Sequence, residues 1–188
     1  MQGIVSLMDD ASAQATRALW AELEREHGLR EAAQSTPYPH VSFHLAEDYD
    51  LARIGRVMRS VAAHTAPCTF RIIGLGAFTA FEPVLYLAVE RTPALDALHA
   101  TLWRELANER VAREPSPLYA SASWIPHVTL AQRDLTPEAL DSLLAAWSSR
   151  DFHRDVFVSD LTLLYRRAGE ASYTPLERLK LSGADAAQ

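Results

Sequence analysis

The 188-residue sequence has almost no cysteine and no long apolar run. Its only cysteine, Cys68, excludes an internal disulfide framework and a zinc site built from several thiolates. The opening segment MQGIVSLMDD has no basic residue, and its apolar run is too short for a signal peptide or a membrane span. We therefore expect a cytoplasmic protein without a membrane segment.

Positive charge is also scarce. The chain has 18 Lys and Arg against 24 Asp and Glu, which gives a formal net charge of −6. A protein that grips long nucleic acid needs clustered basic side chains to neutralise phosphates, so a broad nucleic-acid-binding face is not expected. A local basic pocket remains possible. The hydrophobic content of 48% and the length are ordinary for one globular domain.

Several cofactor and metal motifs are missing as well. No H-E-x-x-H stretch occurs, and no acidic cluster stands beside the histidine motifs described below. The stretch GLGAF at 74–78 contains two glycines but is not followed by a helix at phosphate-loop spacing, so no nucleotide loop is predicted. We expect no cofactor and no metal.

Hydrophobic spacing and turn residues predict alternating strands and helices. The predicted strands are 3–8, 39–46, 68–79, 83–90, a strand around the second histidine motif, 155–167 and 173–181. The predicted helices run from Asp9 or Asp10 to about residue 26, from Asp48 or Asp50 to about 64, from Thr92 through 109, and from Thr136 to about 147. The Pro- and Ser-rich stretch 113–123 is predicted to be a loop.

The order of these elements repeats. The first helix contains LWAELERE (19–26) and the third contains LWRELANE (102–109). Helices favour Leu and Glu, so the match could be accidental, but together with the histidine motifs duplication is the better account. We predict one bilobal α+β domain at 1–181, with lobes built from repeats at about 3–79 and 83–181. The two lobes would be related by an approximate two-fold axis and enclose one cleft. Residues 182–188 are expected to be a flexible tail.

Two nearly identical motifs carry the chemistry. The segment PYPHVSFH (37–44) contains His40 and Ser42, and WIPHVTL (124–130) contains His127 and Thr129. Successive side chains of a strand alternate between faces, so each histidine shares a face with the hydroxyl residue two positions later. If the lobes are related by the two-fold, these four side chains converge on one pocket.

Two imidazoles and two hydroxyls suit phosphate ester chemistry. One imidazole can act as a base while the other acts as an acid, because both titrate near neutral pH. Hydroxyls can hold the non-bridging oxygens on which charge builds. A single strand histidine is more often structural, and two histidines could also hold a metal with a carboxylate, but no Asp or Glu stands at the nearest positions facing the cleft.

These residues resemble the 2H phosphoesterase superfamily, which includes 2′-5′ RNA ligase-like proteins and 2′,3′-cyclic nucleotide phosphodiesterases. Its two His-x-[Ser/Thr]-x motifs are matched by HVSF (40–43) and HVTL (127–130). The resemblance implies a bilobal α+β fold in which two antiparallel sheets line a central cleft with helices outside. It also implies metal-independent opening of a cyclic phosphate, with His40 and His127 catalytic and Ser42 and Thr129 binding the phosphoryl oxygens.

Other side chains are weaker candidates for substrate contacts. His44 lies on the face of His40 if the strand is regular, and there a structural or rim role is favoured. Arg133 continues the face of His127. Aromatic side chains near the motifs could stack on a base, although packing is the commoner fate. The further candidates are Tyr38, Tyr119, Trp124, Tyr165 and Arg167. We expect Trp20, Trp103 and Trp147 in the core, and His27, His64, His99 and His153 at the surface.

The sequence therefore predicts a hydrolase that acts on a small phosphoester, a nucleotide or an RNA end with a cyclic phosphate. Two alternatives stay open: RNA ligation through the same site, and a protein that binds a nucleotide or RNA end without catalysis. We expect a monomer. The sequence does not decide which histidine is the base.

Overall fold

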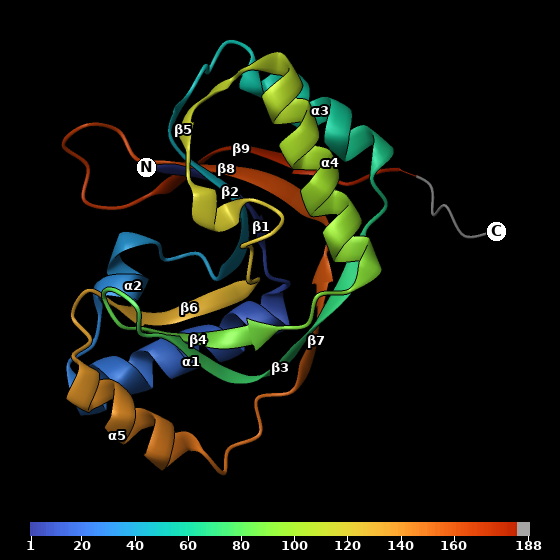
Figure 1. Cartoon of the computed structure of the whole chain (residues 1–188). Helices are drawn as coiled ribbons and strands as arrows, with labels where there is room; N and C mark the ends of the chain where they lie inside the picture. Colours follow the sequence, from blue (N-terminus) through green and yellow to red (C-terminus); the bar gives the residue numbers. More distant parts are fainter. Residues whose placement is uncertain (184–188) are drawn as a thin grey trace.

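The computed structural model describes residues 1–183 and contains antiparallel sheets flanked by helices (Figure 1). The strands are β1 (Gln2–Leu7), β2 (His40–Tyr49), β3 (Cys68–Phe78), β4 (Val84–Val89), β5 (Ala112–Pro115), β6 (His127–Gln132), β7 (Arg154–Val158), β8 (Asp160–Tyr165) and β9 (Thr174–Lys180). The helices are α1 (Asp10–His27), α2 (Glu31–Ser35), α3 (Ile54–His64), α4 (Pro93–Glu109) and α5 (Pro137–Trp147), and a single 3₁₀ turn covers Pro117–Tyr119.

The strands of the described residues form two sheets. The five-stranded sheet has the order β5-β2-β1-β8-β9, and the four-stranded sheet has the order β6-β4-β3-β7. Every pairing within them is antiparallel. The predicted α+β class with two antiparallel sheets is thus confirmed.

The helices α1, α4 and α5 begin at the predicted capping residues. The Asp9 carboxylate accepts a hydrogen bond from the Ser12 backbone N–H at 2.9 Å. The hydroxyls of Thr92 and Thr136 each accept from the N–H three residues later, which satisfies one of the free donors of the first turn. Gly28 ends α1 in the left-handed conformation, with φ of 70°.

Each sheet takes strands from both predicted repeats. β3, from the first repeat, lies in the four-stranded sheet beside β4, whereas β8, from the second, lies in the five-stranded sheet beside β1. The lobes therefore do not coincide with the contiguous ranges 3–79 and 83–181. The predicted single strand 155–167 is wrong for the same reason: it is divided at Ser159 into β7 and β8, which belong to different sheets.

Local boundaries differ from the sequence predictions in three further places. β2 runs on to Tyr49, so α3 begins at Ile54 rather than at Asp48 or Asp50. The predicted loop 113–123 contains most of β5, which adds to the sheet beside the end of β2. The short helix α2 has too few residues to give a periodic signal and was not predicted.

The core lies between the sheets and their helices. Leu95, Leu98, Leu102 and Leu106 of α4 are all buried, as the apolar face predicts. Packing extends slightly past the predicted end of the domain, because the Ser182 and Gly183 N–H groups donate to carbonyls of Ala62 and Thr65. The rest of the predicted tail, 184–188, lies outside the described residues. Within residues 1–183, no helix has the length and apolar character needed to cross a membrane.

Candidate active site

Both motif strands contain a β-bulge immediately after the hydroxyl residue. In β2, Ser42 is paired with Val5 but His44 with Ile4, and in β6, Thr129 is paired with Tyr86 but Ala131 with Leu85. One extra residue in each strand reverses the faces beyond it. Each motif therefore keeps its histidine and hydroxyl on one face, while the residues after the bulge change sides.

The bulge overturns the predicted placement of His44 on the face of His40, and the side chain takes a structural role. Its side chain is only 2% exposed and lies on the apolar side of β2, with Leu45 lining the cavity in its place. The His44 Nδ1–H donates to the Tyr49 hydroxyl at 2.7 Å, and the ring packs against Trp103. Regular alternation fails here because the pattern of residue types does not reveal an inserted residue.

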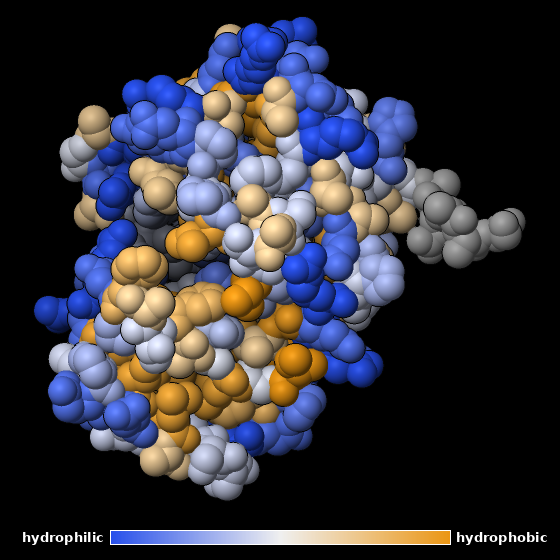
Figure 2. Space-filling view, in the orientation of Figure 1, coloured by the Kyte–Doolittle hydropathy of each residue, from blue (hydrophilic) through white to orange (hydrophobic). Residues whose placement is uncertain are grey.

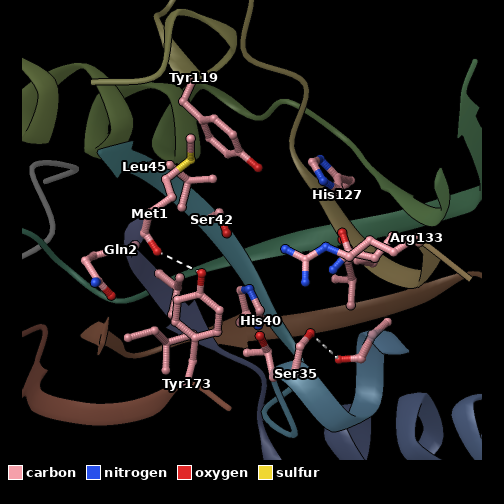
Figure 3. Close-up of a pocket in the computed structure, with 18 of the residues that line it drawn as sticks. Met1, Gln2, Ser35, His40, Ser42, Leu45, Tyr119, His127, Arg133 and Tyr173 are labelled. Carbon is pink, nitrogen blue, oxygen red and sulfur yellow. Dashed lines mark hydrogen bonds between the residues drawn. The ribbon is translucent and has the colours of Figure 1, made fainter. Parts of the chain in front are cut away.

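The four motif side chains line one cavity of about 200 Å³ between the two sheets (Figure 3). His40 and Ser42 come from β2, and His127 and Thr129 from β6. The surface is hollowed between the two lobes in the space-filling view (Figure 2). Around these side chains stand Leu45, Tyr119, Gln132, Arg133 and Tyr173.

The two imidazoles are held in the same way. His40 Nδ1–H donates to the Tyr38 carbonyl at 2.6 Å, and His127 Nδ1–H donates to the Ile125 carbonyl at 2.7 Å. A carbonyl oxygen only accepts, so in each neutral ring Nδ1 carries the hydrogen and Nε2 carries the lone pair. Each Nε2 is left as the ring nitrogen that can exchange a proton with a ligand.

The local environment of both rings favours the neutral form of the imidazole. Burial, with a smaller contribution from the charge of His127, lowers the pKa of His40 to about 4, against the opposing effect of its hydrogen bond to Tyr38. Burial also lowers the pKa of His127, against the opposing effect of its hydrogen bond to Ile125. A bound anion would raise these pKa values, because it stabilises an imidazolium nearby.

Two further polar side chains face this centre. Burial raises the pKa of Tyr119 to about 12, and a hydrogen bond with the Ser42 side chain opposes part of that rise. Arg133, in the left-handed conformation after β6, turns its guanidinium toward the cavity (Figure 3) and donates to Glu31 at 2.9 Å. Arg133 carries the one permanent positive side-chain charge among the described lining residues.

Comparison with known proteins identifies the family. A family model described as the 2′-5′ RNA ligase superfamily matches residues 9–170. The chain belongs to this superfamily. The resemblance to 2H phosphoesterases is thereby confirmed.

Relatives of this 2′-5′ RNA ligase superfamily member agree with that assignment. A protein of Bacillus cytotoxicus with the provisional name of phosphoesterase is 28% identical over 135 residues, which cover 70% of this chain and 73% of the relative. The crystal structure of TT0787 of Thermus thermophilus has a TM-score of 0.69 at 18% identity and covers 97% of this chain and 99% of that one. E. coli LigT complexed with 3′-AMP has a TM-score of 0.60 at 18% identity and covers 96% and 98%.

Several sequence candidates do not line the cavity of this superfamily member. Tyr38 contributes its backbone carbonyl to His40 rather than its ring. The Tyr165 hydroxyl contacts Asp48, and Arg167 pairs with Glu170. These side chains belong to the surrounding surface.

Trp124 is a packing residue and not an exposed stacking surface. It is 2% exposed, and its indole Nε1–H donates to the Ser42 carbonyl at 2.9 Å. Its ring stacks on His99 with centroids 3.9 Å apart.

His99 is itself 1% exposed, so the prediction of a surface histidine there is wrong. It faces inward because the 3₁₀ turn packs against α4, where the Tyr119 carbonyl meets His99 Nε2 at 2.9 Å.

Tyr173 is the principal cavity residue that the sequence did not reveal. Its hydroxyl donates to the Met1 carbonyl and its backbone N–H to the Ser35 carbonyl, both at 2.8 Å. No motif surrounds it, and only the folded chain brings the start of β9 to α2 and the N-terminal strand. Within residues 1–183, no cluster of three or more His, Cys, Asp or Glu side chains is arranged to hold a metal.

Proposed function

We propose that this protein hydrolyses the 2′,3′-cyclic phosphate of a nucleotide or an RNA end, using His40 and His127 as an acid–base pair. The observation that carries the proposal is the pair of imidazoles tied through Nδ1, with Nε2 free, in one cavity with two hydroxyls. Membership of a superfamily of phosphoesterases supports the same reaction class.

In the reaction, one histidine accepts a proton and the other histidine donates one. One neutral histidine accepts a proton from water as the water oxygen bonds to phosphorus. The bond from phosphorus to one ribose oxygen breaks, and the second histidine, as imidazolium, protonates that oxygen. The product is a phosphomonoester beside a free hydroxyl. Ser42 and Thr129 would hold the non-bridging oxygens, and Arg133 would offset their charge.

The volume of the cavity and the net charge of the protein favour a small substrate or the end of an RNA chain. A cavity of about 200 Å³ is smaller than the ~300–1000 Å³ of drug-sized ligand pockets. It would enclose the phosphate and part of the sugar and leave the rest of the ligand outside. The net charge of −6 disfavours a long RNA tract. Structural neighbours described as LigT complexed with 3′-AMP or with NADP+ support a nucleotide ligand.

Turnover of 2′,3′-cyclic nucleotides in EDTA tests the proposal. We expect metal-independent hydrolysis that falls about 10²–10⁴-fold in His40→Ala and in His127→Ala, the range for loss of general acid–base catalysis. His153→Ala, at an exposed position, should match wild type. A bell-shaped dependence of kcat/KM on pH is expected, with limbs that belong to the pair.

Other outcomes point elsewhere. Absence of turnover across a panel of cyclic phosphates, with tight nucleotide binding retained, would replace the hydrolase by a binding protein. Activity lost in EDTA would indicate a metal enzyme. Joining of RNA ends that carry a cyclic phosphate and a free hydroxyl would favour ligation, the reverse reaction, which the family name includes.

A further inference from the structure

The chain turns sharply where the second motif strand ends, and Arg133 stands at the turn. The Asp134 N–H donates to the Gln132 carbonyl at 2.7 Å, only two residues back along the chain. Arg133 has a φ of 63°. That conformation is uncommon for a residue with a Cβ, and it persists only where the surrounding structure holds it. The contacts around the turn therefore decide where the Arg133 side chain points.

The beginning of α2 supplies those contacts. The Asp134 carboxylate accepts hydrogen bonds from the N–H groups of Arg30 and Glu31 at 2.7 and 2.8 Å. The Glu31 carboxylate in return accepts a hydrogen bond from the Arg133 guanidinium at 2.9 Å. Glu31, Arg133 and Asp134 thus form a reciprocal clasp between segments that are 102 positions apart in the chain.

The clasp stands at the edge of the catalytic cavity. Arg133 lines the cavity and extends toward its centre (Figure 3). Ser35 and Thr36, at the other end of α2, line the cavity too. No carboxylate stands among the described lining residues. Through its bond with Arg133, Glu31 therefore places a negative charge beside a cavity whose described lining has none.

The charge of the ligand changes during the proposed hydrolysis. A cyclic phosphodiester carries one negative charge, whereas the phosphomonoester product carries close to two above a pH of about 6. Coulombic attraction to a cation grows in proportion to the charge of the ligand. An unpaired Arg133 would therefore hold the product more tightly than the substrate, and the product would inhibit the enzyme.

We propose that Glu31 is a specificity-determining residue that balances the charge of Arg133, so that the cavity disfavours a dianionic phosphomonoester relative to a monoanionic cyclic phosphodiester. The two ligand classes rest on the proposed function. Glu31 acts through Arg133 and through its own repulsion of the ligand. The side chains of Glu31 and Arg133 are 35% and 49% exposed, so water screens the interaction and keeps the effect moderate.

Calorimetric binding at about pH 8, where a phosphomonoester is a dianion, tests the charge balance without any need for turnover. The probes are 2′-AMP and 3′-AMP as dianions and 2′,3′-cyclic AMP as the monoanion, all in a His127→Ala background so that the cyclic ligand persists. Glu31→Gln keeps the size of the side chain and removes its charge. Binding should tighten by about threefold per unit of ligand charge, which is about tenfold for the monoesters and about threefold for the cyclic ligand.

Two matched variants separate charge from structure. Glu31→Asp keeps the carboxylate, so its relative affinity for the two ligand classes should stay within about twofold of the parent protein. Glu170→Gln removes one negative charge from the ion pair with Arg167, outside the described lining of the cavity, and should also stay within about twofold. Equal tightening of both ligand classes in Glu31→Gln, or the same gain in Glu170→Gln, would overturn the proposal.

Product inhibition is the kinetic readout. With a cyclic nucleotide as substrate, Glu31→Gln should lower the inhibition constant of the phosphomonoester by about tenfold and KM by about threefold. Turnover should therefore slow more strongly than in wild type as product accumulates, whereas Glu31→Asp should follow the wild-type time course. Weaker binding of both ligands in Glu31→Asp and Glu31→Gln alike would show a merely structural role and refute the proposal.

The outcomes distinguish this inference from the proposed function. Turnover in wild type, without a preferential gain of monoester binding in Glu31→Gln, would refute the role of Glu31 and leave the hydrolase intact. Absence of turnover in wild type, with the preferential gain present, would refute the hydrolase and retain Glu31 as a charge-selective residue of a nucleotide-binding site. Thermal melting checks that each variant folds, and Glu31→Ala, which also removes the charge, replaces Glu31→Gln if that variant does not.

Discussion

At the scale of single residues, one inserted position changes the role of a histidine. His44 would lie beside His40 in a regular strand, but the bulge turns it into the core. There its Nδ1–H donates to Tyr49, whose hydroxyl in turn donates to the His44 carbonyl. Burial lowers the pKa of His44 to about 4. Because this ring stays neutral when folded, it couples stability to pH.

We predict that acid weakens the fold through His44. The folded pKa lies below the unfolded value of about 6.5, so the contribution is complete above pH 6.5. It is lost as the pH falls from 6.5 to about 4. The loss is on the order of 3 kcal/mol at about 1.4 kcal/mol per pKa unit.

Urea unfolding at pH 7, 5.5 and 4.5 measures this dependence. His44→Leu should flatten the decline in this window, whereas His153→Ala, at an exposed position, should leave it as in wild type. An identical decline in His44→Leu would show that other groups cause it.

At the scale of elements, each motif strand lacks a partner strand along one edge, in the part that carries its histidine and hydroxyl residue. β6 is an edge strand, and β5 covers β2 only from Ala46 onward. Indole N–H groups take the place of the missing partner strand. Trp20 of α1 donates to the Thr129 carbonyl at 3.1 Å, and Trp103 of α4 donates to the Phe43 carbonyl at 2.9 Å. Each repeated Leu-Trp motif thus supports the histidine strand of the other repeat.

We predict that Trp20→Phe and Trp103→Phe each lower the free energy of unfolding by about 1–3 kcal/mol, because the carbonyl of a partly buried hydrogen bond loses its donor. Each should also reduce kcat through movement of the motif strand. Unfolding in urea and cyclic nucleotide turnover are the measurements. Trp147→Phe is the control, since Trp147 of α5 is buried and its ring packs against Phe152. Equal effects on turnover in all three variants would contradict a specific supporting role.

At the scale of the whole molecule, the chain crosses from one sheet to the other at Ser159. The next residue, Asp160, is almost fully buried and fixes the crossing. Its carboxylate accepts hydrogen bonds from the Leu7 N–H, the Thr162 hydroxyl and Arg178. It therefore ties β8 to β1 and β9, and so joins the sheet of His40 to the strand that arrives from the sheet of His127.

We predict that Asp160→Ala destabilises the protein by about 3 kcal/mol, because the buried Thr162 hydroxyl and the partly buried Leu7 N–H each lose an acceptor at about 1–3 kcal/mol. Arg178 is 56% exposed and can be hydrated, so it adds little. Chemical denaturation measures the change in the free energy of unfolding. Asp155→Ala, at the exposed β7 pair with Arg71, is the control and should change stability little. A similar loss in both variants would refute the special role of the crossing.

How well the sequence predicts a feature depends on how far apart along the chain the interacting residues lie. Capping at Asp9, Thr92 and Thr136 was predictable, since it depends on residues three positions apart. The convergence of His40 and His127 was predictable from repetition and a resemblance to a known family. The inward turn of His44, the burial of Trp124 and the part played by Tyr173 were not, because each depends on a contact between distant segments.

The sequence by itself determined the class of the fold, the two histidine motifs and the face that each histidine shares with its hydroxyl, since period-two alternation holds within a short regular strand. Only the tertiary structure decided which strands form each sheet and which carboxylate meets Arg133. Those choices follow from the bulges, the crossing at Ser159 and the turn around Arg133, where contacts between segments override the local pattern.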